Sequence, residues 1–471
     1  MARLCLVGAW TWALPAAGQA LEPLVGVLHA RSTASGGAET VEELAARAAA
    51  GGVDVLVLAD SYHLSVEYGL PFLRRLVRFQ RSLPSLQTPA ALAAYLQEVE
   101  RVDALYPRVV VLAGVELTPF YWWEAGLGRQ AWDLGGLDRR LVVLGLDAQE
   151  VAPLPVAGSA ALRVWHWSSL LLLWPLLGLA YAVGARGRHP AWLCYGVGAA
   201  SLLFAIANAP FTVPLWDGYS GDLGAAPHQH LLDRVQAAGG LASWTLPQEP
   251  PAVPLRILGH PVRLTGRPGS AEMVAQTRGY AAFAALAGEE ERGVGAGQVW
   301  DQVLGQHLRG ERETPVWAVG ERGTLPAGGE APFGLVQTVL FVQERTAEGV
   351  LEALRSGRTY ARRCAGPLLV LEEFSVRAEA QQAIWGGQVR SHGKAVVRGR
   401  VGLAGGRGER VQVQLIRDGA VVLQRQGTPP LAVEHRQAGL KPGQGAWFRL
   451  VATSRTGRLL SNPICVRGVE P

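Results

Sequence analysis

Two uncharged apolar stretches near the middle of this 471-residue chain restrict its fold more than any other feature. Residues 167–185 contain no ionisable side chain except Tyr181, and residues 191–211 are similar. Each stretch is about as long as the roughly 20 residues that a helix needs to cross the hydrocarbon of a bilayer. Tryptophans cluster near their ends, as in the aromatic belts of membrane proteins: Trp165, Trp167, Trp192 and Trp216. We predict a transmembrane helical hairpin over residues 164–211; a buried hairpin in a soluble core is the alternative.

Two further features predict the orientation of this hairpin. The short loop between the stretches contains Arg186 and Arg188, which the positive-inside rule places in the cytoplasm. Residues 1–20 are typical of an export signal, with Arg3 before an apolar run and small residues near Ala20. An uncleaved anchor and a first strand are alternatives for that segment. Together these features place the rest of the chain on the extracytoplasmic side of a bacterial inner membrane.

The charge and cysteine content exclude some kinds of function. The net charge is +5, but there is no basic run with interleaved aromatic residues, so we do not expect nucleic-acid binding. A basic protein near anionic lipid is the simpler interpretation. The four cysteines form no CxxC pair and no zinc spacing. Cys364 and Cys465 could form a disulfide in an oxidising compartment, although they lie in different predicted domains.

Strands and helices alternate on both sides of the hairpin, in residues 21–163 and 212–375, which predicts an α/β fold. The clearest unit has strands at 24–30 and 53–59 around a helix at 39–50. The other predicted helices are 68–82, 88–106, 230–238, 271–287, 297–309 and 346–356. The other predicted strands are 109–115, 140–146, 241–246, 315–319 and 336–342. In such folds, functional sites lie at the carboxyl ends of the strands.

The last part of the chain has a different pattern. Several segments of residues 376–471 alternate apolar and polar side chains, and Asp418-Gly419 is a hairpin signal between two of them. We predict a small β-sandwich domain there.

The sequence contains no GxSxG, no Walker loop and no dinucleotide motif, so no organic cofactor is expected.

The polar residues that end the strands resemble those of the polymerase-and-histidinol-phosphatase (PHP) family. That family has Asp-Leu-His-x-His-Ser-Thr, Thr-Asp-His, Gly-x-Glu, Ala-His-Pro and Asp-x-His at successive strand ends. Here the first motif reads Val27-Leu-His29-Ala-Arg31-Ser-Thr33, and the second ends in Asp60-Ser61. Glu116 preserves the third motif. The fourth has Leu246 in place of histidine, and Glu321 stands at the acidic position of the last.

This resemblance implies a distorted (β/α)7 barrel, interrupted by the transmembrane hairpin, with metal-activated water acting on a phosphate ester. The surviving ligands would be His29, Asp60 and Glu116, with Glu321 a doubtful fourth. They could hold one divalent cation, such as manganese, zinc or iron. Arg31 replaces a ligand and could pair with a carboxylate or bind a phosphate or carboxylate.

His63 could replace the lost second-motif histidine, but a surface-loop histidine fits its position as well.

The overall layout also resembles uncharacterised bacterial membrane proteins that carry a PHP-like barrel, a transmembrane segment and a C-terminal β domain. We therefore expect a membrane-tethered, extracytoplasmic pseudoenzyme that binds a small anionic ligand or an envelope protein. A single-metal phosphoesterase is one alternative. The other is an envelope interaction module that acts through residues 376–471.

Overall fold

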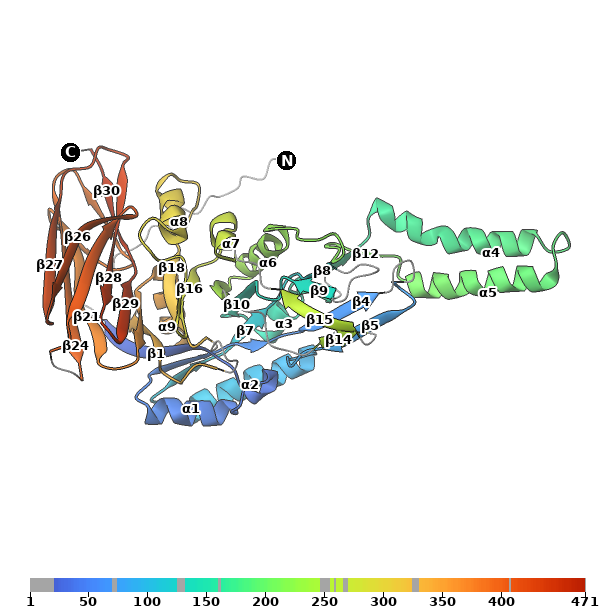
Figure 1. Ribbon diagram of the computed structural model, residues 1–471, viewed down its shortest axis with the longest axis horizontal. Coiled ribbons are helices and arrows are strands. Elements are labelled where there is room, and N and C mark those ends of the chain that lie inside the picture. The colour runs from blue at the N-terminus through green and yellow to red at the C-terminus, as the bar shows by residue number, and fades with distance from the viewer. Residues whose placement is uncertain are drawn as a thin grey trace, which may run out of the picture.

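The computed structural model describes residues 21–69, 74–124, 132–159, 162–245, 255–257, 260–265, 270–323, 330–405 and 408–470. The predicted export signal at 1–20 and the fourth motif at Leu246-Pro247 lie outside the described residues. The molecule is elongated (Figure 1): C-terminal strands form one end, an α/β body lies in the middle, and a helical hairpin projects from the other end.

The first strand–helix–strand unit forms as predicted. Strand β1 (Glu22–Ala30) pairs in parallel with β2 (Val55–Leu58), and α1 (Val41–Ala50) connects them. A capping box of Thr40 and Glu43 starts α1 by satisfying its free backbone N–H groups. Burial of Leu44, Ala45 and Ala48 on one face of α1 fixes the helix against the sheet.

Two sheets organise the α/β body. Strands β2 and β6 (Val110–Leu112) belong to the first sheet, and their continuations β3 (Asp60–Ser61) and β7 (Gly114–Leu117) belong to the second. The second sheet continues through β10 (Arg140–Leu144), β13 (Leu241–Thr245) and β16 (Ala282–Ala287). Strands β17 (Glu290–Glu291) and β18 (Trp317–Glu321) both pair with β16. Among the described strands, hydrogen bonding does not close a barrel.

Helices and small strands complete the body. The helices are α2 (Pro89–Leu105), α3 (Ala148–Val151), α6 (Ala226–Ala237), α7 (Ser270–Gln276), α8 (Val299–Leu308) and α9 (Ala347–Ser356), with a 3-10 turn η1 (Thr33–Ser35). A separate sheet contains β8 (Trp122–Glu124), β9 (Trp132–Gly135), β14 (Leu255–Ile257) and β15 (His260–Thr265).

Two helix predictions were wrong. Within residues 68–82 the chain forms an antiparallel pair, β4 (Ser65–Gly69) and β5 (Arg78–Ser82), because Val66 and Tyr68 pack in a small aromatic core. The predicted helix 271–287 ends early, at α7, and its second half forms the fully buried β16. Burial between β13 and β18 overrides the helical preference of this alanine-rich segment. The predicted strand 109–115 divides into β6 and β7.

The apolar stretches form a hairpin that projects from the body. The 3-10 helix η3 (Trp167–Leu173) continues into α4 (Trp174–Gly184), which packs against α5 (Ala191–Asn208). By length and composition both arms could cross a membrane, and only 17% of each span is buried. The short strands β11 (Arg163–Val164) and β12 (Val213–Pro214) pair at the base and hold the two ends of the hairpin together.

Two sheets with a common apolar core form the C-terminal region. One contains β21 (Leu368–Ala378), β22 (Gln381–Ile384), β24 (Ala395–Ala404) and β27 (Leu431–Gln437). The other contains β23 (Gln388–Ser391), β25 (Val411–Arg417), β26 (Ala420–Gly427), β28 (Gly445–Thr453), β29 (Gly457–Ser461) and β30 (Ile464–Gly468). This second sheet continues into the body through β20 (Thr359–Cys364) and β19 (Val336–Val342), which pairs with β1.

Local features of this region test two predictions. Asp418 and Gly419 both have positive φ, 48° and 84°, and they connect β25 to β26, which confirms the predicted hairpin. Cys364 and Cys465 are free thiols, so the disulfide considered for them does not form. Burial raises the pKa of Cys465 to about 12, which makes it an unreactive core residue.

Candidate functional site

A distortion of the first strand directs His29 into the body. The register of β1 against β2 shifts between Leu28 and Ala30, and His29 has a left-handed backbone with φ of 64°. Bulges of this kind redirect a side chain, and non-glycine residues adopt this conformation only when their surroundings hold it. The His29 ring lies between two carboxylates: its Nε2 is 3.3 Å from Glu116 Oε1, and its Nδ1 is 2.9 Å from Glu321 Oε2.

Glu116 is the centre of the site. It lies on β7, aligned with Ser61 on β3, and its side chain is 2% exposed. Its Oε2 accepts hydrogen bonds from Ser61 Oγ at 2.8 Å, from Arg31 at 2.7 Å and from Arg140 at 3.1 Å. Both carboxylate oxygens therefore have partners within the protein. We call His29, Arg31, Glu116, Arg140 and Glu321 the Glu116 cluster.

Opposite charges within the Glu116 cluster stabilise one another's ionised forms. Burial alone would raise the pKa of Glu116, but the Arg140 and Arg31 guanidinium groups outweigh burial and hold it well below its usual range. Burial would also lower the pKa of His29, yet the Glu321 and Glu116 carboxylates raise it to about 9. His29 is therefore an imidazolium at neutral pH, and both of its nitrogens donate hydrogen bonds.

The predicted site residues do not all meet at this point. Glu321, at the end of β18, joins the cluster through His29. Asp60 is fully buried but accepts hydrogen bonds from Ser32 N, Ser32 Oγ and Ser35 Oγ at 3.0, 2.9 and 2.5 Å. It thus anchors the turn that follows β1. His63 lies in the loop before β4, where its Nδ1 is 3.3 Å from the carbonyl oxygen of Gln87.

The sequence prediction missed Arg140. This arginine opens β10, whose five residues are all buried, and it donates to the Leu137 carbonyl at 2.6 Å as well as to Glu116. An arginine at the start of a strand that is otherwise apolar was the available signal, because a buried guanidinium requires an anionic or carbonyl partner.

The residues present do not fit a metal ion. Among the residues that the structure describes, no group of three or more His, Cys, Asp or Glu side chains is placed to hold one. Both nitrogens of His29 already face carboxylates, Nε2 facing Glu116 and Nδ1 facing Glu321, so neither nitrogen points to an open position. Arg31 and Arg140 also place fixed positive charge on Glu116, the residue that a cation would need most.

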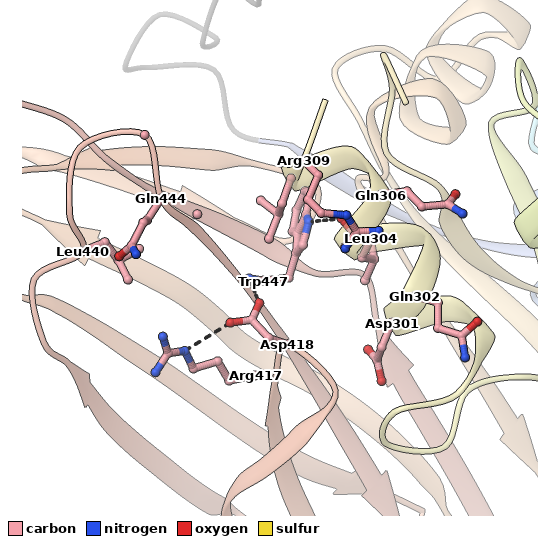
Figure 2. Close-up of a pocket in the computed structure, with 14 residues that line it drawn as sticks. Asp301, Gln302, Leu304, Gln306, Arg309, Arg417, Asp418, Leu440, Gln444 and Trp447 are labelled. Carbon is pink, nitrogen blue, oxygen red and sulfur yellow. Dashed lines mark hydrogen bonds and ion pairs between the residues drawn. The ribbon is translucent and has the colours of Figure 1, made fainter. Parts of the chain in front are cut away.

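A cavity of about 830 Å³ lies elsewhere, between α8 and the C-terminal strands (Figure 2). Its lining includes Asp301, Arg309, Arg417, Asp418 and Trp447, and no residue of the Glu116 cluster. A buried bidentate ion pair of Arg449 with Asp301, at 2.8 and 2.7 Å, joins the two sides of this cavity. Its volume falls in the range of small-molecule sites.

No protein-family model and no curated protein matches the chain. Among solved structures, it is similar to a two-domain protein from Bacteroides vulgatus ATCC 8482 described as containing a predicted PHP-like metal-dependent phosphoesterase. The identity is 10%, the TM-score is 0.34, and the match covers 93% of this chain and 95% of that one. A candidate metal-dependent phosphoesterase from Bifidobacterium adolescentis ATCC 15703 is also similar, at 12% identity and a TM-score of 0.28, covering 65% and 92%. At these values, what this chain can do chemically is argued from its own residues.

Proposed function

We propose that this chain is a membrane-anchored, PHP-like pseudoenzyme whose former metal site is filled by its own cationic side chains. The observation that carries this proposal is the set of contacts around Glu116, which is bound by His29, Arg31 and Arg140. A divalent cation would have to displace a guanidinium and remove a proton from His29. Because two carboxylates already face three cations in the cluster, additional positive charge is unfavourable there.

The same contacts support structural pairing as the role of Arg31. Its guanidinium lies 2.7 Å from Glu116, and its side chain is only 25% exposed. The Glu116 carboxylate raises the pKa of Arg31, so this arginine stays charged. An anionic ligand would have to compete with a buried carboxylate for the same guanidinium. Anion binding by Arg31 is therefore the weaker proposal.

Membrane anchoring is supported by the exposed apolar surface of the hairpin. Leu171 and Leu177 are each 75% exposed, and Trp192 is 74% exposed. An 18-residue α-helix such as α5 is about 27 Å long, close to the roughly 30 Å of bilayer hydrocarbon. Arg186 and Arg188 lie in the exposed loop at the hairpin tip, so we propose that this tip is cytoplasmic and the body extracytoplasmic.

A second proposal concerns binding by the C-terminal region. The cavity between α8 and the β25–β26 turn is the observation that favours it, because its volume suits a small molecule. Its lining mixes guanidinium, carboxylate and amide groups with glycine backbone. We propose that a ligand or an envelope protein binds at this cavity, with the body as its support.

Metal analysis tests the first proposal. The full-length protein, purified in detergent, would be exposed to manganese, zinc and iron, and bound metal would be measured by mass spectrometry. We expect no stoichiometric metal and no metal-dependent phosphoester hydrolysis. Arg31→His/Ser61→His provides a matched control, since it restores the histidines missing from the first two motifs and should increase metal uptake. Stoichiometric metal in the unaltered protein, removed by Glu116→Ala, would instead support a single-metal phosphoesterase.

A further inference from the structure

The β4–β5 pair contacts the base of the membrane hairpin. Arg75, in the turn that precedes β5, donates hydrogen bonds to the carbonyls of Asn208 and Thr212 at 3.1 and 2.6 Å. Asn208 is the last residue of α5. Figure 1 shows β4 and β5 beside the point where α5 joins the body. When α5 crosses a bilayer, Arg75 therefore lies at the depth of the lipid headgroups.

Three more arginines lie around this point. Arg74 is 46% exposed and stacks 3.7 Å from the ring of Tyr219, and Arg78 is 52% exposed. Arg163, on β11, donates to Thr212 Oγ1 at 3.2 Å. We call Arg74, Arg75, Arg78 and Arg163 the juxtamembrane arginines. All four belong to β5, β11 or the turn before β5, which are the parts of the body closest to the hairpin.

Nearby carboxylates do not balance this positive charge. Asp217 is 3.9 Å from Arg74, and Glu67 is 3.6 Å from Arg78. Within the part of the chain that the structure describes, two loosely paired carboxylates thus face four guanidinium groups. Exposed pairs at such distances are weak. Burial lowers the pKa of Arg75, and the charges of Arg163 and Arg78 lower it further, which shows that these cations repel one another.

Exposed aromatic residues lie at the same level. Trp165 and Trp167, on the chain that leads from β11 into η3, are 60% and 73% exposed, with ring centroids 5.8 Å apart. Tryptophans in such positions prefer the boundary between headgroups and hydrocarbon. This surface thus has positive charge above an aromatic belt, as expected of a protein face that meets anionic lipid.

We propose that the juxtamembrane arginines bind the headgroup phosphates of an anionic phospholipid, such as phosphatidylglycerol, in the leaflet from which α5 enters the body. The inference rests on the membrane insertion of the hairpin proposed above. A guanidinium group forms paired hydrogen bonds with phosphate oxygens, and each basic residue near a membrane adds to the attraction for anionic lipid. Bound lipid would supply the negative charge that Asp217 and Glu67 do not.

Lipid retention tests the proposal. Full-length protein would be placed in nanodiscs of equal parts phosphatidylglycerol and phosphatidylcholine, and the lipids it retains on release would be counted by native mass spectrometry. We expect a preference for phosphatidylglycerol that falls roughly fivefold or more in Arg74→Gln/Arg78→Gln. Both side chains are exposed, so the variant should fold. Arg436→Gln is the matched control, because Arg436 is 81% exposed and lies on β27 at the far end of the molecule.

A second measurement separates this proposal from the membrane anchor itself. Resistance to carbonate extraction from vesicles of pure phosphatidylcholine reports insertion of the hairpin without any contribution from anionic lipid. Extraction of the protein there would overturn the anchor and, with it, this inference. Resistance to carbonate together with equal retention of the two lipids, in the unaltered protein and in Arg74→Gln/Arg78→Gln, would overturn the lipid site alone. The lipid site would also be overturned if soluble glycerol phosphate displaced phosphatidylglycerol as well as the lipid itself does, since the ligand would then be a free anion.

Discussion

The Glu116 cluster and the α4–α5 hairpin depart from the usual distribution of side chains in opposite ways. The cluster buries charged groups, whereas the hairpin exposes large apolar ones such as Leu177 and Trp192. In the cluster, each charge has a partner of opposite sign within the protein. Among the described residues, none covers the large apolar side chains of the hairpin, and an apolar surface of this kind is typical of a face that meets a membrane or another protein.

This difference shows which region indicates function. A buried set of charges in which every group has a partner gives no sign of a missing ligand. The chemistry and dimensions of an exposed apolar surface indicate what kind of partner covers it. The same reasoning leads from the unbalanced juxtamembrane arginines to an anionic lipid.

Deletion of the hairpin should have the largest effect. Replacing residues 167–208 with a short glycine-serine linker removes the exposed apolar surface, while the pairing of β11 with β12 keeps the two ends of the body together. The membrane-bound fraction, measured by carbonate extraction and sedimentation, should fall by more than about tenfold. Both versions would begin at residue 21, so that the N-terminal segment contributes nothing. A deletion variant that still sediments with membranes would contradict the proposed anchor.

Removal of the central anion should strongly destabilise the body. Glu116→Gln leaves His29, Arg31 and Arg140 without their shared partner, and breaking such a buried arrangement costs about 3–5 kcal/mol. The free energy of unfolding would be measured by denaturant titration. Glu434→Gln is the control, because its pair with Arg398 is exposed and should contribute less than about 1 kcal/mol. A Glu116 variant as stable as the control would mean that the cluster is not structural.

The stability of the cluster should fall at high pH. The pKa of His29 rises from 6.5 in the unfolded chain to about 9 in the folded protein, so its stabilisation is complete below pH 6.5 and is lost as the pH rises through 9. The loss should be on the order of 3 kcal/mol, because each pKa unit corresponds to about 1.4 kcal/mol. The measurement compares unfolding free energies of the unaltered protein and His29→Gln across this pH range. Parallel pH profiles for the two proteins would contradict a charged His29.

Removal of Arg31 should have the smallest effect of the four. After Arg31→Ala, Glu116 still has Arg140, His29 and Ser61, and the lost side chain was 25% exposed. We expect a loss of about 1–2 kcal/mol in unfolding free energy, below that of Glu116→Gln. Metal uptake should stay negligible, because Arg140 and the protonated His29 remain. Stoichiometric manganese binding by Arg31→Ala would show that Arg31 alone keeps a metal out.

The sequence predicted much of the fold because its signals are local. The capping box at Thr40, the Asp418-Gly419 turn and the apolar runs of α4 and α5 all act within a few residues. The errors at residues 68–82 and 271–287 arose where tertiary burial decides. An arginine every few residues is compatible with a helix face or with a strand pair, and alanine-rich β16 is a strand only because its neighbours enclose it.

The candidate site was only partly predictable. Strand order and strand ends placed His29, Glu116 and Glu321 near one another, and the structure does bring these residues together. Asp60 hydrogen-bonds to Ser32 and Ser35 and does not join the Glu116 cluster. That choice depends on side-chain geometry, which the pattern of apolar and polar residues along a strand does not specify. The role of Arg140 depends on which strand lies beside β7, a long-range contact that the sequence does not specify.

The unbroken sheet that runs from the body into the C-terminal strands has a mechanical consequence. Because β1, β19, β20, β29 and β28 are successive neighbours in one hydrogen-bonded sheet, the two parts have no flexible joint there about which to swivel. The hairpin lies at the opposite end of the molecule from these C-terminal strands (Figure 1). With the hairpin inserted in a bilayer as proposed, this continuous sheet would keep the cavity beside α8 at a set height above the membrane, and a partner that reaches it would have to span that height.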